Sequence, residues 1–323
     1  MNWFGRSVVR PLVTVVALVA LNAPVIVASL AAALVAASSI GCAPSRGTWG
    51  DREGASPATI YLYTDDMAYI VPVTVDLRRD RAVREAARLV VEWPGGGALR
   101  STFPDGSRLR SVEVDGTVAR VRASIGDGAL DESGIARAME ALAWTLTGFP
   151  DVKRVSLVAG AREMGPAPRP PFINHVGPKA WDCSMKVVLW FAYRGAYLVP
   201  VTRFVPRSAF PHVSAMRQLI AGPPDGATLA RTIPDGMALL SLSVEGGTCT
   251  VDMSARSATA RPAGGAMEDL ALQSIVLTLT EFVDVRAVRL LIGGKSDAGL
   301  GGHVILDAPV MRGAINPTHP GTN

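Results

Sequence analysis

Metal-binding and nucleophilic residue types are scarce in this chain of 323 residues, which has four histidines and three cysteines. It contains no HExxH motif, no pair of histidines at i and i+4 and no CxxC motif, so the sequence predicts no metal site. GxSxG and Walker sequences are also missing, which removes the usual signals of a hydrolase nucleophile and of a phosphate-binding loop. We therefore predict no enzyme activity, no cofactor and no metal.

Positive charge is in only small excess, because 32 Lys and Arg stand against 28 Asp and Glu and give a formal net charge of +4. No stripe of basic residues with interleaved aromatics is visible, so the sequence predicts no nucleic-acid partner. Hydrophobic residues make up 49% of the chain, a share that is typical of globular proteins and argues against disorder. The length alone suggests about two domains.

The first 45 residues carry almost no charge. Arg6 and Arg10 precede an uncharged apolar run that lasts until Arg46. Such a run is long enough to cross the ~30 Å hydrocarbon core of a membrane, and basic residues before an apolar segment are typical of export signals. We predict that segment 1–45 is a signal peptide or an uncleaved membrane anchor. Both interpretations place the rest of the chain outside the cytoplasm.

The apolar run closes with the sequence SIGC, which ends at Cys42. Small residues before a lone cysteine resemble a bacterial lipobox, so Cys42 is a candidate lipidation site. Ser39 stands where a leucine-like residue is usual, so a cysteine at the end of a transmembrane helix remains the alternative. Cys183 and Cys249 form a possible disulfide outside the cytoplasm, although the first lies in a linker-like run and the second in a strand-like run.

Four sequence blocks occur twice in the same order. YIVPVTVDL, TFPDG, SVEVDG and TLTGFPDV begin at residues 69, 102, 111 and 145, and their counterparts YLVPVTRFV, TIPDG, SLSVEG and TLTEFVDV begin at 197, 232, 241 and 278. The offset grows slowly along the chain, as expected when short insertions fall in loops. The sequence therefore predicts two tandem copies of one domain of ~110–130 residues, an ordinary domain size.

The repeated blocks predict the secondary structure of each copy. Residues 59–64 and 186–193 are rich in β-branched and aromatic residues, which is typical of strands. Residues 80–93 place apolar residues at i, i+4 and i+7 among charged ones, which predicts an amphipathic helix. With the later blocks, each copy is predicted to follow the order β-β-α-β-β-α-β. The predicted fold class is α+β, with two small domains after an N-terminal export or anchor segment.

The turns between these elements have their own signals. The shared Pro-Asp-Gly sequence at 104–106 and 234–236 predicts a turn from the first helix into a hairpin, because proline fixes φ and glycine accepts positive φ. Asp115-Gly116 predicts a tight hairpin turn. Its counterpart at 245–247 predicts a looser version.

Proline and glycine are concentrated in residues 161–185, where we expect the linker between the copies. Within this run PRPPFIN resembles PVMRGAIN near the end of the chain, and both close with Ile-Asn. Each copy is therefore predicted to carry a short C-terminal arm, which reduces the linker to about 175–185. The predicted domains are 59–175 and 186–316, followed by a loose tail at 317–323.

An acidic pair, Asp65-Asp66, follows the first strand and could support acid–base chemistry. The second copy has Tyr193-Arg194 there, so the pair is not a feature of the repeated unit. We interpret it as a solvated loop.

The ordered set of motifs resembles the GerMN-domain family. The second copy carries LVP, GP, TIPDG, TLTEF and GGK at 198–200, 222–223, 232–236, 278–282 and 293–295, and the first copy carries VP, TFPDG and TLTGF in the same order. The resemblance implies a fold related to the ring-building motif of secretion-system ring proteins. It also implies a membrane-tethered lipoprotein of sporulation or spore germination that acts without catalysis in a channel-like complex between mother cell and forespore. The implied partners are the membrane, the protein itself and ring-forming sporulation proteins.

Two other interpretations remain open. An envelope lipoprotein could bind a cell-wall or other extracytoplasmic ligand in a cleft between the copies, lined by Trp181, Trp190 or Tyr193, although such residues more often fill cores. A cell-wall hydrolase has no carboxylate or metal set to support it. The assembly role is favoured because exposed edge strands can pair with partners, and head-to-tail contacts build rings or filaments.

Overall fold

The structure is a computed structural model, and it describes residues 54–94, 97–128, 130–224, 227–254, 264–296 and 307–317. These residues belong to one compact unit, Asp51–Asn323. The predicted export or anchor segment and Cys42 lie outside the described residues. Within the described ranges, no helix combines the length and the apolar character needed to cross a membrane.

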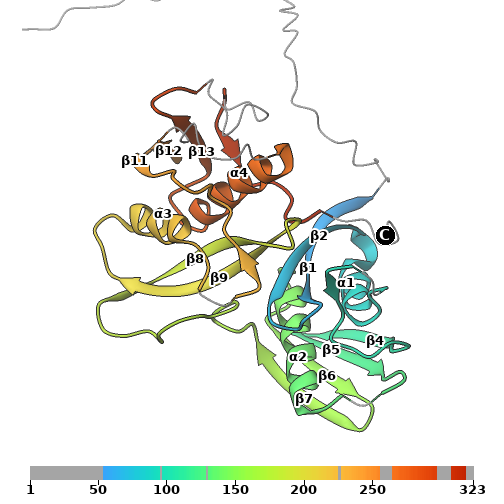
Figure 1. The fold of residues 1–323 in the computed structure, drawn as a ribbon. Coiled ribbons are helices and arrows are strands. Elements are labelled where there is room, and N and C mark those ends of the chain that lie inside the picture. Colours follow the sequence, from blue (N-terminus) through green and yellow to red (C-terminus); the bar gives the residue numbers. More distant parts are fainter. Residues whose placement is uncertain are drawn as a thin grey trace, which may run out of the picture. The chain divides into compact units, whose positions relative to one another are not determined.

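The first repeat consists of two sheets that both contact the same two helices. Its sheets have the strand orders β2-β1-β3 and β4-β5-β6-β7. Figure 1 labels the longer strands of both sheets together with α1 and α2. A short 3-10 turn, Arg79–Arg81, leads into α1. The elements are β1 (Ala55–Thr64), β2 (Ile70–Arg78), α1 (Ala82–Val91), β3 (Leu99–Arg100), β4 (Arg108–Asp115), β5 (Val118–Ser124), α2 (Glu132–Leu146), β6 (Arg154–Ala159) and β7 (Arg162–Pro168).

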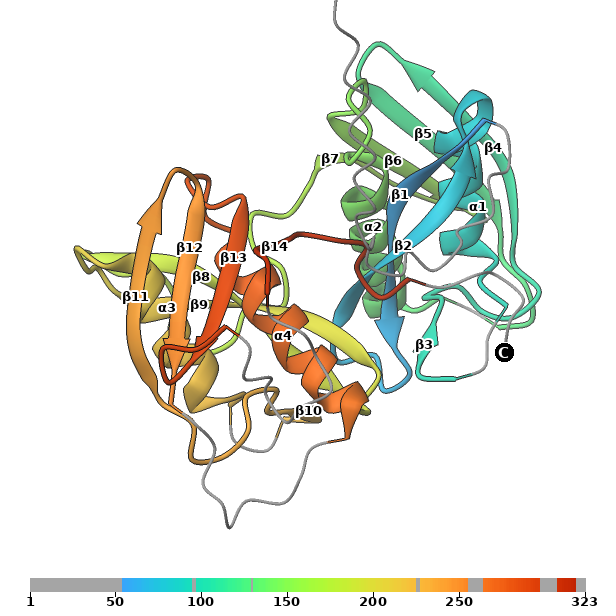
Figure 2. The same ribbon diagram turned by 90° about the horizontal axis from the view of Figure 1, so that it is seen from above.

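The second repeat has the same topology, with the strand orders β10-β8-β9 and β11-β12-β13-β14 (Figure 2). This confirms the predicted α+β class and the duplication. The elements are β8 (Ser184–Tyr193), β9 (Tyr197–Pro206), α3 (Pro211–Ala221), β10 (Leu229–Ala230), β11 (Leu239–Glu245), β12 (Thr248–Met253), α4 (Gly265–Leu279), β13 (Ala287–Ile292) and β14 (Val310–Met311).

The second helix of each repeat crosses between parallel strands, from β5 to β6 and from β12 to β13. The apolar spacing of α2 buries Leu142 and Leu146 completely against the core. Asp131 caps the start of α2, because its side chain accepts a hydrogen bond of 2.6 Å from Gly134 N. A buried helical face and a capped start explain why this segment is a helix.

The shared Pro-Asp-Gly turn lies where it was predicted, between the first helix and the hairpin of each repeat. Gly106 and Gly236 adopt φ of +79° and +82°, in the left-handed region that glycine tolerates best. The prediction of a looser second hairpin is wrong. Residues 115 and 118 pair across the first turn, and residues 245 and 248 pair across the second, so both connections have the same length.

Each repeat has strands that the predicted order lacks. The two-residue strands β3 and β10 add a third strand beside β1 and β8. β7 lies within the Pro/Gly-rich run from which a linker was expected, and it pairs antiparallel with β6. Proline is compatible with β7 because the strand is at the edge of its sheet, where a missing N–H breaks no interior ladder. These strands lead into the C-terminal arms.

Candidate functional site at the junction of the repeats

No group of three or more His, Cys, Asp or Glu in the described part of the chain is placed to hold a metal ion. The most elaborate polar arrangement lies instead where the two repeats meet. There the edge strands β2 and β9 contact each other. An edge strand has backbone N–H and C=O groups without partners in its own sheet, so something must satisfy them.

The C-terminal arm of each repeat supplies these partners. The first arm is residues 169–176, and the second arm is residues 312–316. Thr202 N of β9 donates to Ile173 O of the first arm at 3.1 Å, and Thr202 O accepts from Val176 N at 3.1 Å. Thr74 N of β2 donates to Ile315 O of the second arm at 2.8 Å. Each arm therefore pairs with the edge strand of the other repeat.

Asn174 ties the two edge strands together. Its Oδ1 accepts from Ile70 N at 2.8 Å, and its Nδ2 donates to Ile70 O and to Pro200 O, both at 2.7 Å. Ile70 lies on β2 and Pro200 on β9. One side chain thus satisfies three backbone groups on two strands.

Asn316 repeats this arrangement from the other side. Its Oδ1 accepts from Leu198 N at 2.7 Å, and its Nδ2 donates to Leu198 O at 2.7 Å and to Pro72 O at 2.9 Å. Leu198 and Pro72 are the counterparts of Ile70 and Pro200 in the 128-residue offset of the repeats. The junction therefore has an internal two-fold pattern, with one asparagine from each arm.

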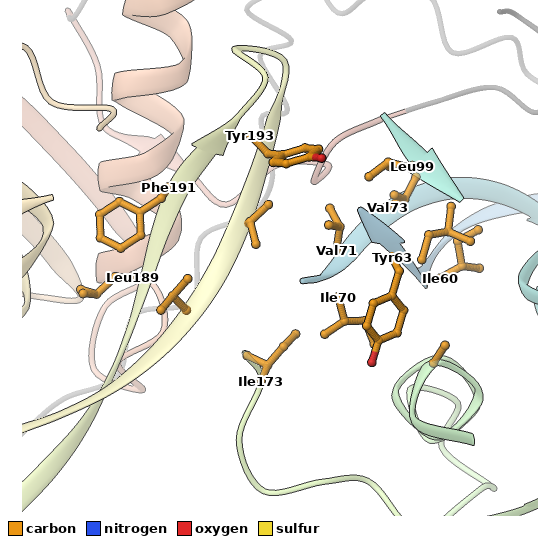
Figure 3. Packing of buried hydrophobic residues seen from close by; sticks show 14 of the residues in the cluster. Ile60, Tyr63, Ile70, Val71, Val73, Leu99, Ile173, Leu189, Phe191 and Tyr193 are labelled. Carbon is orange, nitrogen blue, oxygen red and sulfur yellow. The ribbon is translucent and has the colours of Figure 1, made fainter. Parts of the chain in front are cut away.

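Apolar side chains accompany these hydrogen bonds. Figure 3 shows Ile70 and Val71 of β2 in the same region as Ile173 of the first arm and Tyr193 of β8. All four belong to a single cluster of buried residues that continues through both repeats. Ile173 is 7% exposed although it stands in an arm, so the arm contributes to the core as well as to the backbone pairing.

Each arm is also held at the end of its own second helix. The Arg169 guanidinium donates to Trp144 O at 3.1 Å and lies 4.9 Å from the centroid of the Trp144 ring. The Arg312 guanidinium donates to Glu281 Oε1 at 2.9 Å and lies 5.4 Å from the Trp190 ring. Arginine near a helix C-terminus interacts favourably with the last carbonyls. The repeated arginine therefore directs each arm toward the junction.

The acidic pair occupies this junction, so its interpretation as a solvated loop is wrong for Asp65. Arg194 Nη2 donates to Asp65 Oδ2 at 2.5 Å, and the Tyr193 hydroxyl donates to Asp65 Oδ1. Burial raises the pKa of Tyr193, and the hydrogen bond to Asp65 raises it further. Both donors stand in the second repeat, in the loop that corresponds to the acidic pair.

Asp66 bonds within its own loop. Its Oδ1 accepts from Thr64 Oγ1 at 2.6 Å and from Ala68 N at 3.0 Å. Burial alone would raise the pKa of Asp66, but these hydrogen bonds outweigh burial and lower it. The carboxylate therefore acts as an acceptor that organises the loop.

Two of the three aromatic residues proposed to line a ligand cleft are buried and do not do so. Trp190 and Tyr193 are each 2% exposed, so neither ring offers a face to a ligand. Trp181 is 42% exposed in the linker. The disulfide considered for Cys183 and Cys249 is not formed, because Cys183 is an exposed free thiol before β8 and Cys249 is a buried free thiol within β12.

A cleft of about 940 Å³ lies elsewhere, wholly within the first repeat. The end of α1, the Pro-Asp-Gly turn and the start of α2 form its walls. Trp93 lines it, together with three arginines and three carboxylates: Arg100, Arg108, Arg137, Glu92, Asp105 and Asp131. At the positions equivalent to the three arginines, the second repeat has Ala230, Ala238 and Leu270. The charged lining is therefore a property of the first repeat.

Sequence reasoning missed Asn174 and Asn316 as functional residues, although it noted the Ile-Asn that ends each arm. Two facts together could have indicated them: the Ile-Asn pair ends both arms, and asparagine tolerates positive φ. Both asparagines adopt that conformation, with φ of +45° and +44°. What the sequence did not contain was the identity of the strands that they bind.

Comparison with known proteins gives this architecture a family. A family model described as Germane, sporulation and spore germination, matches residues 59–162 and 188–298. Spore germination protein GerM of Bacillus subtilis (strain 168) is 25% identical over 268 residues, which cover 74% of this chain and 72% of that protein. The solved tandem GerMN domains of the sporulation protein GerM from Bacillus subtilis align with 81% of this chain and 100% of that chain, at a TM-score of 0.60 and 21% identity, and show the same fold. The chain therefore belongs to the Germane family of sporulation and spore germination and is similar to GerM in its two tandem GerMN domains.

Proposed function

We propose that this protein is a non-enzymatic assembly protein of sporulation or spore germination, tethered to the membrane outside the cytoplasm. It would contribute to a ring or channel-like complex between mother cell and forespore, together with other copies of itself or with ring-forming sporulation proteins. The observation that carries this proposal is the junction. Crossed arms, two asparagines and a shared core join two similar domains into a single block, and a block with defined faces is what an assembly needs.

Strand edges support the proposal by offering places for contact. The crossed arms cover β2 and β9, but β4 and β11 end their sheets without a further strand among the described residues. Unpaired strand edges are common sites of association between chains. The apolar segment 1–45, with Cys42 as the candidate lipid-bearing residue, supports tethering because it has the features of an export signal or anchor.

A fluorescent tag at the C-terminus of the full chain would test the proposed place of action in sporulating cells. We expect the signal to gather at the membranes between mother cell and forespore. Capture of candidate ring components by the same tagged chain would test the assembly role. A tagged chain that stays evenly distributed and retains no ring component would contradict the proposal.

The cleft of the first repeat favours a second candidate function, the binding of a cell-wall or other envelope ligand. Arginines and carboxylates around an aromatic ring suit a ligand that carries both hydroxyl and charged groups, as glycan–peptide fragments do. Replacement of Arg100, Arg108 and Arg137 with the Ala, Ala and Leu of the second repeat should abolish retention on purified cell walls if this function is correct. Equal retention of the variant and the natural chain would exclude the cleft.

A further inference from the structure

The junction is built like the interface of a two-fold dimer, although both halves belong to one chain. Asn174 of the first arm reaches Pro200, and Asn316 of the second arm reaches Pro72. The arm residues Ile173 and Ile315 pair with equivalent threonines on β9 and β2. Contacts of this kind, in which each half offers the same patch to the other, are the hallmark of isologous association.

The exception to this equivalence lies at the hairpin loops. Thr64 pairs with Leu99, and Tyr193 pairs with Leu229. In this strand register, which differs by one residue from the alignment of the sequence blocks, Asp65 and Arg194 occupy equivalent positions. These two residues meet as an ion pair across the junction. Equivalent positions of a two-fold interface meet only near its axis, and the two that meet here carry opposite charges.

This difference makes the junction selective for unlike repeats. Two first repeats would bring Asp65 against another Asp65, and two second repeats would bring Arg194 against another Arg194. Like charges placed together disfavour such pairs, whereas a first repeat and a second repeat attract each other. The surface therefore fits a second repeat as partner of a first repeat, from whichever copy of the chain it comes.

The linker is the covalent tie that keeps the pairing within one chain. Residues 177–183 are exposed along their whole length, and seven residues extend to about 25 Å. Every hydrogen bond of the junction could form equally well between two chains, so exchange would leave those bonds unchanged and would cost the opening of the linker region. Exchange of equivalent elements between protomers is a low-cost route to oligomers.

We propose that copies of this chain exchange repeats, so that the first repeat of one copy pairs with the second repeat of another. This inference deepens the proposed assembly role, on which it rests, by naming a second copy of the chain as partner and the junction as the surface. Reciprocal exchange closes a pair of chains, and sequential exchange closes a ring or extends a filament.

Two single charge reversals, Asp65→Arg and Arg194→Asp, test the exchange in the compact unit of residues 51–323. Within either variant the closed junction brings like charges together. Between the two variants, one exchanged junction regains the natural Asp65–Arg194 pair and the other has the same pair reversed. We expect co-refolding of the variants at equal concentration to raise the fraction of two-chain complexes severalfold over either variant refolded alone, measured by light scattering and native mass spectrometry.

The double variant carrying both reversals in one chain is the matched control, because its closed junction has complementary charges again. It should refold as the natural chain does, and co-refolding it with the natural chain should not raise the fraction of two-chain complexes. Exclusively monomeric mixtures would overturn the proposal, and so would two-chain complexes that form equally in the single variants alone. Circular dichroism of each variant establishes that it is folded, and co-refolding of isotope-labelled with unlabelled natural chain measures exchange even where a single variant fails to fold.

The outcome is separate from that of the assembly role. A protein that captures ring components through β4 or β11 but never exchanges repeats would retain the proposed function and lose this inference. A protein that exchanges repeats but gathers at no membrane between mother cell and forespore would retain this inference and lose the proposed function.

Discussion

Asparagine satisfies two demands together at positions 174 and 316. The backbone at both positions has positive φ, which asparagine tolerates better than most residue types. The side chain must also accept one hydrogen bond and donate two, and an amide group does this without a charge. A carboxylate of the same shape would keep the acceptor and lose both donors.

This difference gives a prediction for Asn174→Asp. Asp also tolerates positive φ, so the substitution isolates the two donated hydrogen bonds. We expect the free energy of unfolding to fall by about 1–3 kcal/mol, because two carbonyl oxygens lose their donor and face a negative charge. Urea titration of residues 51–323 would measure it, and Asn316→Asp should lose a similar amount.

Ala180→Asp adds the same charge in the exposed linker and serves as the control, with an expected change within about 0.5 kcal/mol. Unfolding of Asn174→Asp at the same urea concentration as the natural chain would show that the asparagine bonds add nothing to stability.

The two described cysteines predict a clear difference in reactivity. Cys249 is 0% exposed, and burial, followed by the nearby Asp284, raises the pKa of its thiol to about 12. Since the thiolate is the reactive form, Cys249 should resist thiol reagents in the folded protein, whereas the exposed Cys183 should react. In residues 51–323 we expect one thiol to react with a chromogenic disulfide reagent, and a second only in denaturant. Cys183→Ser should remove the reaction of the folded protein, and immediate labelling of two thiols in the natural chain would refute this assignment.

At the scale of elements, the two free edges differ in their protection. β4 carries Arg110 at its bulge, and β11 has Leu240, which is 57% exposed, at the equivalent position. Charged side chains on an edge strand oppose pairing with other chains. The second repeat therefore offers the less protected edge.

Leu240→Arg gives β11 the residue of β4 and should reduce association of the protein with itself or with captured partners, while stability changes by no more than about 0.5 kcal/mol. Arg110→Leu, the opposite change on β4, should increase association. Sedimentation at rising protein concentration would compare the two variants. Equal association of both variants and the natural chain would exclude these edges as contact sites.

The elements also separate what the sequence could predict from what it could not. Helix α2 and the Pro-Asp-Gly turns were predictable, because their apolar spacing and turn chemistry are local. β7 was not, because its prolines and glycine resemble a linker, and only pairing with β6 makes it a strand. The crossing of the arms was also beyond the sequence, because Ile315 and Thr74 are far apart along the chain and no local pattern records which distant strand an arm will meet.

The ion pair at the junction is a second contact that the sequence could not predict. The sequence shows that Asp65 has no acidic counterpart in the second repeat, and this difference favours a solvated loop. The structure places Asp65 directly against the residues that replaced it. Residues that differ between two repeats can therefore be the ones that bind each other, and only the folded structure, which contains both repeats, shows this.

At the scale of the whole molecule, buried tyrosines predict sensitivity to alkaline pH. Burial raises the pKa of Tyr63, and Glu140, to which the Tyr63 hydroxyl donates at 2.7 Å, raises it further. The folded pKa lies above the unfolded value near 10, so the stabilising effect is complete below pH 10 and is lost as pH rises toward the folded pKa. Above pH 10 the free energy of unfolding should fall by up to about 1.4 kcal/mol per pH unit for this group.

Tyr63→Phe removes the ionisable group. The variant should therefore lose the contribution of this one proton, up to about 1.4 kcal/mol per pH unit, to the fall in the free energy of unfolding. Urea unfolding at pH 9, 10 and 11 would measure it. Tyr197→Phe is the control, since no described residue forms a hydrogen bond with the Tyr197 hydroxyl. A slope that is unchanged in Tyr63→Phe would contradict the assignment to this tyrosine.

The crossed arms also set an order of events during synthesis. Ile315 N donates to Thr74 Oγ1 from 241 positions downstream, so the edge of β2 stays open until the second arm has been synthesised. A nascent or prematurely terminated product would expose a bare strand edge to its neighbours, and contacts between distant positions form slowly. The second arm therefore completes the first repeat only after the second repeat has been synthesised, so the edge of β2 is exposed throughout that interval.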